Sequence, residues 1–207
     1  MILKPKHIWL VNFVLEIHTL WNLKRKFERI ILDGTFEDKK KPILVLANHF
    51  SWWDGIWIAY LNIKFLKRKF HFMMLEEQLR KYWVFKYIGG FSVQKNSKSI
   101  MESLRYTTEI LSDARNMVFM FPQGRIQSIY EDQFQFEKGV SWVIKNAPKK
   151  VQILFVVNLV DYLSRPKPSV YIHLQEFEPE NDQLEYIQES FQSFYNQCIK
   201  RQRQKTD

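Results

Sequence analysis

The sequence predicts an α/β fold in which a mixed, largely parallel sheet is covered by helices. The first observation is that short apolar runs alternate with longer stretches of helical character. The second is the run Ile43–Ala47, which is apolar at every position and therefore suits a central strand buried on both faces. The third is composition, because 46% of the 207 residues are hydrophobic and 16% are aromatic, enough for a substantial core. We therefore expect a single domain over residues 1–207.

Residues 1–28 are expected to form an N-terminal helical segment. Residues 8–20 are apolar but contain Glu16 and His18, and the stretch is too short for a membrane span and has no signal-peptide cleavage site. A basic cluster follows at once: Lys24, Arg25, Lys26 and Arg29. Such a segment can lie in a membrane interface or pack on the domain as an ordinary helix, and the sequence leaves both readings open.

Residues 29–178 are expected to form the α/β core. Strands are predicted at residues 43–47, 70–74, 118–121, 153–157 and 170–174. Helices are predicted at residues 54–66, 76–87, 97–115 and 134–146. Pro166 and Pro168 make a rigid connection before the last strand. Residues 179–207 are predicted to form a C-terminal helix that ends in a polar tail.

His49 and Asp54 follow the central strand and suggest acid–base chemistry. A histidine can take a proton at neutral pH, and a carboxylate can fix its tautomer and stabilise the imidazolium. Ser51 and Asp54 have capping-box spacing with Ser51 as N-cap, so a helix is expected to begin between His49 and Asp54. The alternative is structural: Asp54 caps the positive end of the helix, and His49 binds backbone.

A second polar turn follows the strand predicted at residues 118–121. Pro122 ends strand pairing, Gly124 allows close approach of the backbone to a ligand, and Arg125 can bind a phosphate or carboxylate through two hydrogen bonds. The alternative is an ordinary β-turn with a surface arginine. Because ligands bind at the carboxyl ends of parallel strands, this turn and the His49 turn are expected to share one site.

These motifs resemble those of a known family. The stretches Asn48-His49-x4-Asp54 and Phe121-Pro122-Gln123-Gly124 are similar to the first and third motifs of the glycerol-3-phosphate and 1-acylglycerol-3-phosphate acyltransferases. Residues 88–95 resemble the middle motif, residues 137–140 resemble the lysine–glycine segment after the third, and residues 154–159 stand in the place of the fourth. The resemblance implies a glycerol-3-phosphate acyltransferase-like fold.

The resemblance also implies a reaction. An acyl group would move from a thioester, on coenzyme A or acyl carrier protein, to a hydroxyl of a lipid acceptor, with His49 as general base and Asp54 orienting it. The substrate-binding residues implied are Lys95, Phe121, Pro122, Gln123, Gly124 and Arg125. No acyl-enzyme, cofactor or metal is implied, and His7, His18, His71 and His173 are scattered singly. The protein would act at the cytoplasmic face of a membrane, peripherally or interfacially anchored.

Three departures from the family pattern concern the acceptor. Gln123 stands where the family usually has glutamate, Arg125 follows Gly124 directly instead of one residue later, and Lys95 replaces an arginine. A lysine attracts phosphate without the planar fork of arginine. Lys95 and Arg125 favour a phosphate-bearing acceptor. An unphosphorylated amphiphilic alcohol, such as a glycolipid or a pigment glycoside, is the competing acceptor.

The formal net charge of +9 indicates an anionic partner, and both thioester donors and an anionic membrane surface satisfy it. A non-catalytic lipid-binding protein that kept the fold is a second interpretation, motivated by Gln123. A nucleic-acid-binding module is disfavoured, because the basic residues are dispersed and no nucleic-acid motif occurs. Cys198 is the one cysteine, so the chain forms no internal disulfide.

Overall fold

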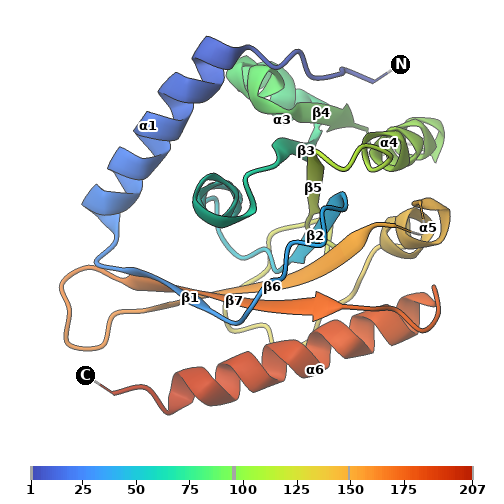
Figure 1. Ribbon diagram of the computed structural model, residues 1–207. Coiled ribbons are helices and arrows are strands. Elements are labelled where there is room, and N and C mark those ends of the chain that lie inside the picture. Colours follow the sequence, from blue (N-terminus) through green and yellow to red (C-terminus); the bar gives the residue numbers. More distant parts are fainter. Residues whose placement is uncertain (1, 95–96, 149, 207) are drawn as a thin grey trace.

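A seven-stranded sheet forms the centre of the molecule (Figure 1). The computed structural model describes residues 2–94, 97–148 and 150–206. The strands are β1 (Ile30–Asp33), β2 (Ile43–Ala47), β3 (Lys69–Leu75), β4 (Gly90–Val93), β5 (Asn116–Met120), β6 (Gln152–Asp161) and β7 (Ser169–Phe177), in the order β1-β7-β6-β2-β5-β3-β4. Every neighbouring pair is parallel except β6 and β7. The predicted mixed, largely parallel sheet is therefore confirmed.

Helices cover both faces of this sheet. They are α1 (Trp9–Lys26), α2 (Asp54–Leu61), α3 (Glu76–Lys81), α4 (Ser97–Ile110), α5 (Gly139–Asn146) and α6 (Leu184–Arg203), with a π-helical turn at Asn62–Leu66 and a 3₁₀ segment η2 at Trp83–Ile88. The central strand β2 shows the two layers. Leu44 and Leu46 pack in a core shared with α4, α5 and α6, whereas Ile43 and Val45 pack in a core shared with α2 and the end of α1. Figure 1 accordingly shows α6 and α1 on opposite sides of β6 and β7.

The structure corrects several predicted elements. It adds two short strands, β1 and β4, that the sequence analysis did not assign at the sheet edges. The helix predicted at residues 134–146 begins only at Gly139. Phe134 and Phe136 instead lie in extended chain and pack on Phe191 of α6, with ring centroids 5.4 Å away in both pairs. The side chains of Gln192 and Gln188 accept the backbone N–H groups of these two phenylalanines, so α6 replaces the bonds of the missing turn.

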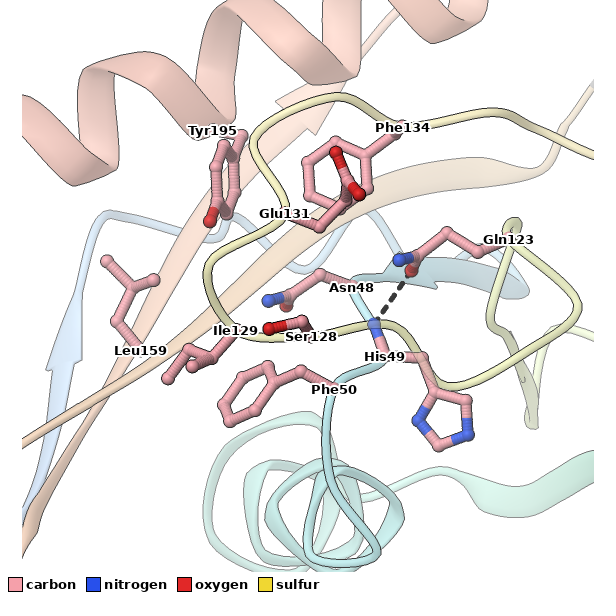
Figure 2. A pocket seen from close by; sticks show the side chains of 10 residues that line it. All are labelled: Asn48, His49, Phe50, Gln123, Ser128, Ile129, Glu131, Phe134, Leu159 and Tyr195. Carbon is pink, nitrogen blue, oxygen red and sulfur yellow. Dashed lines mark hydrogen bonds between the residues drawn. The ribbon is translucent and has the colours of Figure 1, made fainter.

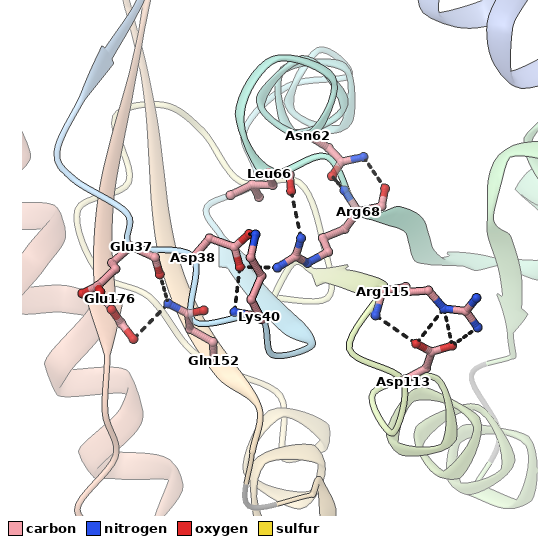
Figure 3. A network of polar contacts seen from close by, with 10 residues as sticks. All are labelled: Glu37, Asp38, Lys40, Asn62, Leu66, Arg68, Asp113, Arg115, Gln152 and Glu176. Atoms are coloured by element: carbon pink, nitrogen blue, oxygen red, sulfur yellow. Dashed lines mark hydrogen bonds and ion pairs between the residues drawn. The ribbon is translucent and has the colours of Figure 1, made fainter.

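A polar network closes the end of the sheet opposite His49 (Figure 3). Asn62 donates to the carbonyl of Arg68 at 2.9 Å and accepts its N–H at 2.9 Å, which ends the π-helical turn. The Arg68 guanidinium pairs with Asp38 in the loop before β2. Gln152, at the start of β6, donates to the carbonyl of Glu37 at 2.7 Å. These bonds hold the loop between β1 and β2 in place, so β2 enters the sheet in a defined register.

Two histidines hold the N-terminal segment against β3. His7 Nε2 and His71 Nδ1 lie 3.4 Å apart, and His71 is buried. Burial lowers the pKa of His7 from 6.5 to about 4, and burial likewise lowers the pKa of His71 to about 3. Both rings are therefore neutral at pH 7 in the folded chain.

We expect the free energy of unfolding to fall as the pH is lowered from 6.5 towards 4. Unfolded histidines take up protons near pH 6.5, whereas His7 and His71 resist protonation in the folded chain, so falling pH favours the unfolded chain. A buried histidine held neutral costs on the order of 1 kcal/mol for each pH unit in this window. Denaturant titrations at several pH values measure this slope, and His71→Phe should reduce it. If the free energy of unfolding of His71→Phe fell with pH as steeply as that of the unsubstituted chain, His71 would not be the source of the pH dependence.

Candidate active site

The end of β2 is joined to β6 by a pair of asparagines. The Asn48 side chain donates to the carbonyl of Asn158 at 2.9 Å and accepts the N–H of Asn158 at 2.8 Å. It therefore extends the pairing of β2 with β6 by one residue, directly before His49. Sequence analysis assigned no role to either residue. The available signal was a buried asparagine within the otherwise apolar stretch 153–160.

His49 and Asp54 are in direct contact, as expected. His49 Nδ1 lies 2.8 Å from Asp54 Oδ2, and the same oxygen accepts the N–H groups of Phe50 at 2.7 Å and Ser51 at 2.8 Å. Asp54 is fully buried, and this burial raises its pKa while the hydrogen bonds from His49, Ser51 and Phe50 oppose the rise. Because a carboxylate oxygen only accepts, Nδ1 carries the ring proton and Nε2 carries the lone pair.

The predicted capping of α2 is wrong in detail. The helix begins at Asp54, and its flanking residue Trp53 makes no side-chain capping bond. Ser51 Oγ accepts the N–H of Trp53 at 3.1 Å, one residue short of the bond that an N-cap serine makes in a capping box. The second hydrogen bond of a capping box is present, since the Asp54 carboxylate accepts the Ser51 N–H. This hydrogen bond turns the carboxylate back towards His49.

The turn after β5 meets His49, so the two predicted loops share one site. The Phe121 ring stacks on the imidazole with centroids 3.8 Å apart and planes 5° from parallel. Gln123 Oε1 accepts the backbone N–H of His49 at 2.7 Å. Gly124 has a left-handed φ of 62°, and a Cβ there would lie 2.9 Å from the side chain of Glu137, so glycine suits this position. The Gly124 N–H donates to the Phe121 carbonyl at 3.0 Å and closes the turn, and the Pro122 carbonyl accepts the Glu137 N–H.

The proposed acceptor-binding residues are not equivalent in the structure. Gln123 is only 3% exposed and faces the backbone of His49. Arg125 is exposed and forms no ion pair within the described residues. Lys95 lies outside the described residues. Arg125 is therefore the described residue of this set whose charge can reach a ligand.

A comparison with known families identifies the chain. The family model described as acyltransferase matches residues 15–160, which include both loops of the site. This chain belongs to the acyltransferase family. A search of curated proteins finds no match to the acyltransferase.

A small pocket of the acyltransferase lies beside the His49 backbone (Figure 2). It is lined by Asn48, His49, Phe50, Gln123, Ser128, Ile129, Glu131, Phe134, Leu159 and Tyr195. Its free volume is ≈ 10 Å³, room for about one water molecule and far too little for an acyl chain. Figure 2 shows the imidazole turned away from Leu159 and Tyr195. The pocket thus lies on the side of the loop away from the imidazole, and it is not the place where the substrate would meet Nε2.

The acyltransferase contains a second histidine–aspartate pair. His173 Nδ1 lies 2.9 Å from Asp33 Oδ2, close to the distance in the His49 pair. His173 is fully buried, however, and its Nε2 is enclosed without a hydrogen-bond partner among the described residues. Burial lowers the pKa of this histidine. No substrate hydroxyl can reach its Nε2, so this pair is structural, and His49 is the accessible one.

Proposed function

We propose that this acyltransferase moves an acyl group from a thioester, on coenzyme A or acyl carrier protein, to a hydroxyl, with His49 as general base. The single observation that carries the proposal is the 2.8 Å contact of Nδ1 with buried Asp54, which leaves the Nε2 lone pair available. The imidazole is 19% exposed, so a substrate can reach it. Proton transfer of this kind contributes on the order of 10²–10⁴ to a rate.

In the proposed reaction, His49 Nε2 takes the hydroxyl proton as the oxygen attacks the thioester carbonyl. The C–O bond forms, the C–S bond breaks, and the imidazolium returns the proton to the leaving thiolate. Asp54 stabilises the imidazolium while the charge exists. The stacked Phe121 ring holds the imidazole plane, which limits the reorganisation needed at the moment of attack.

We further propose that the acceptor carries a phosphate, as glycerol phosphate and lysophospholipids do. Exposed Arg125 supplies a bidentate donor that follows the turn bonded to His49. An unphosphorylated amphiphilic alcohol is the second candidate, because Arg125 is the one cation among the described residues of this set that could bind a phosphate. Thiol release from acyl thioesters tests both. The acceptors are glycerol 3-phosphate, lysophosphatidic acid, other lysophospholipids and an uncharged glycolipid. Release that requires a phosphate acceptor supports the first candidate, and release only with the glycolipid supports the second.

We also propose that helix α1 docks on the surface of an anionic membrane. Its exposed apolar residues repeat at helical spacing and form one stripe: Trp9, Leu10, Phe13, Val14, Ile17 and Trp21. Lys24, Arg25 and Lys26 follow in its last turn. Within the described residues we find no helix with the length and hydrophobicity needed to cross a bilayer. An apolar stripe that ends in cations suits an interfacial position.

Helix α1 is attached to the domain at both ends, and Phe27, directly after it, packs beside the catalytic loop. The N–H of Ile8 bonds to the carbonyl of Tyr87 where α1 begins, and Phe27 after its end packs on Trp53 with centroids 5.1 Å apart. Trp52, two residues before Asp54, is exposed and contacts Tyr82. Exposed apolar side chains therefore occur both on α1 and on the loop that holds the base, and we propose that a lipid acceptor enters from the membrane.

We expect the triple substitution Trp9→Ser, Phe13→Ser, Ile17→Ser to weaken binding to anionic vesicles by at least about tenfold, because each buried side chain contributes roughly 1.5–3 kcal/mol. Vesicle co-sedimentation at low and high salt measures it. The matched control is Glu16→Ser with His18→Ser, which changes exposed polar positions of the same helix. Equal binding by both variants would contradict the docking of this stripe.

A further inference from the structure

The backbone N–H and C=O groups of His49 are held in a closed ring of hydrogen bonds. His49 N–H donates to Gln123 Oε1 at 2.7 Å, the Gln123 amide nitrogen donates to Gln127 Oε1, and the Gln127 N–H donates to the His49 carbonyl at 2.9 Å. The ring joins the loop after β2 to the loop after β5, which lie 74 residues apart at the His49–Gln123 contact. Both backbone groups of His49 are therefore satisfied by two glutamines of one loop.

The orientation of the Gln123 amide follows from its neighbours. The His49 N–H can only donate, so the atom that faces it is the oxygen, and the NH₂ group is left to face Gln127. Gln123 is 3% exposed and uses both ends of its amide in this ring. The Gln123 amide therefore already uses both its oxygen and its nitrogen in hydrogen bonds within the two loops.

We propose that Gln123 is a positioning residue that sets the place of the His49 imidazole, and that it does not bind the acceptor. The inference rests on the proposed role of His49 as general base. Asp54 fixes the tautomer through Nδ1 and also accepts the Phe50 N–H, and Phe121 fixes the ring plane. Gln123 and Gln127 bind the N–H and the C=O of His49 itself, on either side of the carbon from which the imidazole projects. A shift of about 1 Å in a reacting group can lower a rate by about 10².

The test compares Gln123→Met with Gln123→Glu. Methionine keeps the length of the side chain but provides only a weak acceptor. Glutamate keeps an oxygen for the His49 N–H, and Gln127 can turn its amide to donate to the second oxygen. We expect Gln123→Met to lower kcat about 10–100-fold with the acceptor KM changed less than about 3-fold. For Gln123→Glu, both kcat and the acceptor KM should stay within about 3-fold of the values of the unsubstituted chain.

Gln152→Met is the matched control. Gln152 is also a buried amide at 3% exposure, but it lies at the start of β6, at the opposite end of the strands, and bonds to Glu37 and Glu176 (Figure 3). This variant loses both hydrogen bonds of the Gln152 amide without touching the site, so its kcat should be unchanged. A raised acceptor KM with unchanged kcat in Gln123→Met would overturn the proposal and make Gln123 an acceptor ligand.

Hydrogen exchange at the His49 amide separates failure of this inference from failure of the proposed function. The Gln123→Met variant should exchange that proton about tenfold faster, whereas Gln152→Met should leave it unchanged. If Gln123→Met exchanges the His49 amide proton faster but the unsubstituted chain turns over no thioester, the hydrogen bond from His49 to Gln123 is supported and the catalytic role of His49 is refuted. Unchanged exchange in Gln123→Met would overturn the positioning role whatever the activity.

Discussion

His49→Ala is expected to lower kcat for acyl transfer by about 10²–10⁴, because it removes the group that takes the hydroxyl proton. The acceptor KM should change little, since the imidazole acts in the transition state more than in binding. Steady-state thiol release with saturating acyl thioester measures both constants. Secondary structure and the midpoint of denaturant unfolding should stay close to those of the unsubstituted chain, because the His49 side chain is only partly buried.

His18→Ala is the control for this substitution, because His18 is exposed on α1 and bonds to Asn22 of the same helix. It should retain full kcat. Turnover by folded His49→Ala at the rate of the control would refute the proposed base.

Asp54→Asn is expected to lower kcat by about 10²–10⁴ and the free energy of unfolding by about 1–3 kcal/mol. The loss of rate follows because a neutral amide stabilises the imidazolium less and can favour the wrong tautomer. The loss of stability follows because Oδ2 accepts three N–H groups in a fully buried place, and an amide matches them poorly. Activity assays and denaturant titrations of the same preparation measure the two effects.

The second histidine–aspartate pair provides the control for Asp54→Asn. Asp33→Asn changes the partner of His173, at a similar N–O distance of 2.9 Å but with no accessible Nε2. We expect it to alter stability and leave kcat unchanged. Equal losses of kcat in the two variants would show that the effect is one of general stability.

The central strand and the His49–Asp54 contact could be predicted from the sequence, because local rules agree with the fold there. An unbroken apolar run suits a strand covered on both faces, and β2 has the predicted bounds with every residue buried. The histidine and the aspartate are five residues apart across the start of a helix, so their contact needs no distant partner. Both polar turns follow parallel strands, which places them at the same edge of the sheet.

The features that were missed depend on contacts between distant segments. β1 and β4 have four residues each and gain their strand character from pairing with β7 and β3. Phe134 and Phe136 looked helical, but packing on α6 keeps them extended. Gln123 was predicted to bind substrate, and its hydrogen bond to the His49 backbone, 74 residues away, was not predicted. Local patterns carry no information about such partners.

The most direct measurement is product analysis after incubation of the purified acyltransferase with an acyl thioester and the acceptor panel, with His49→Ala beside it. We predict an ester at the acceptor hydroxyl together with one equivalent of free thiol, and loss of both in His49→Ala. Formation of the same ester by the folded variant, or thioester hydrolysis with no acylated acceptor, would contradict the proposed function.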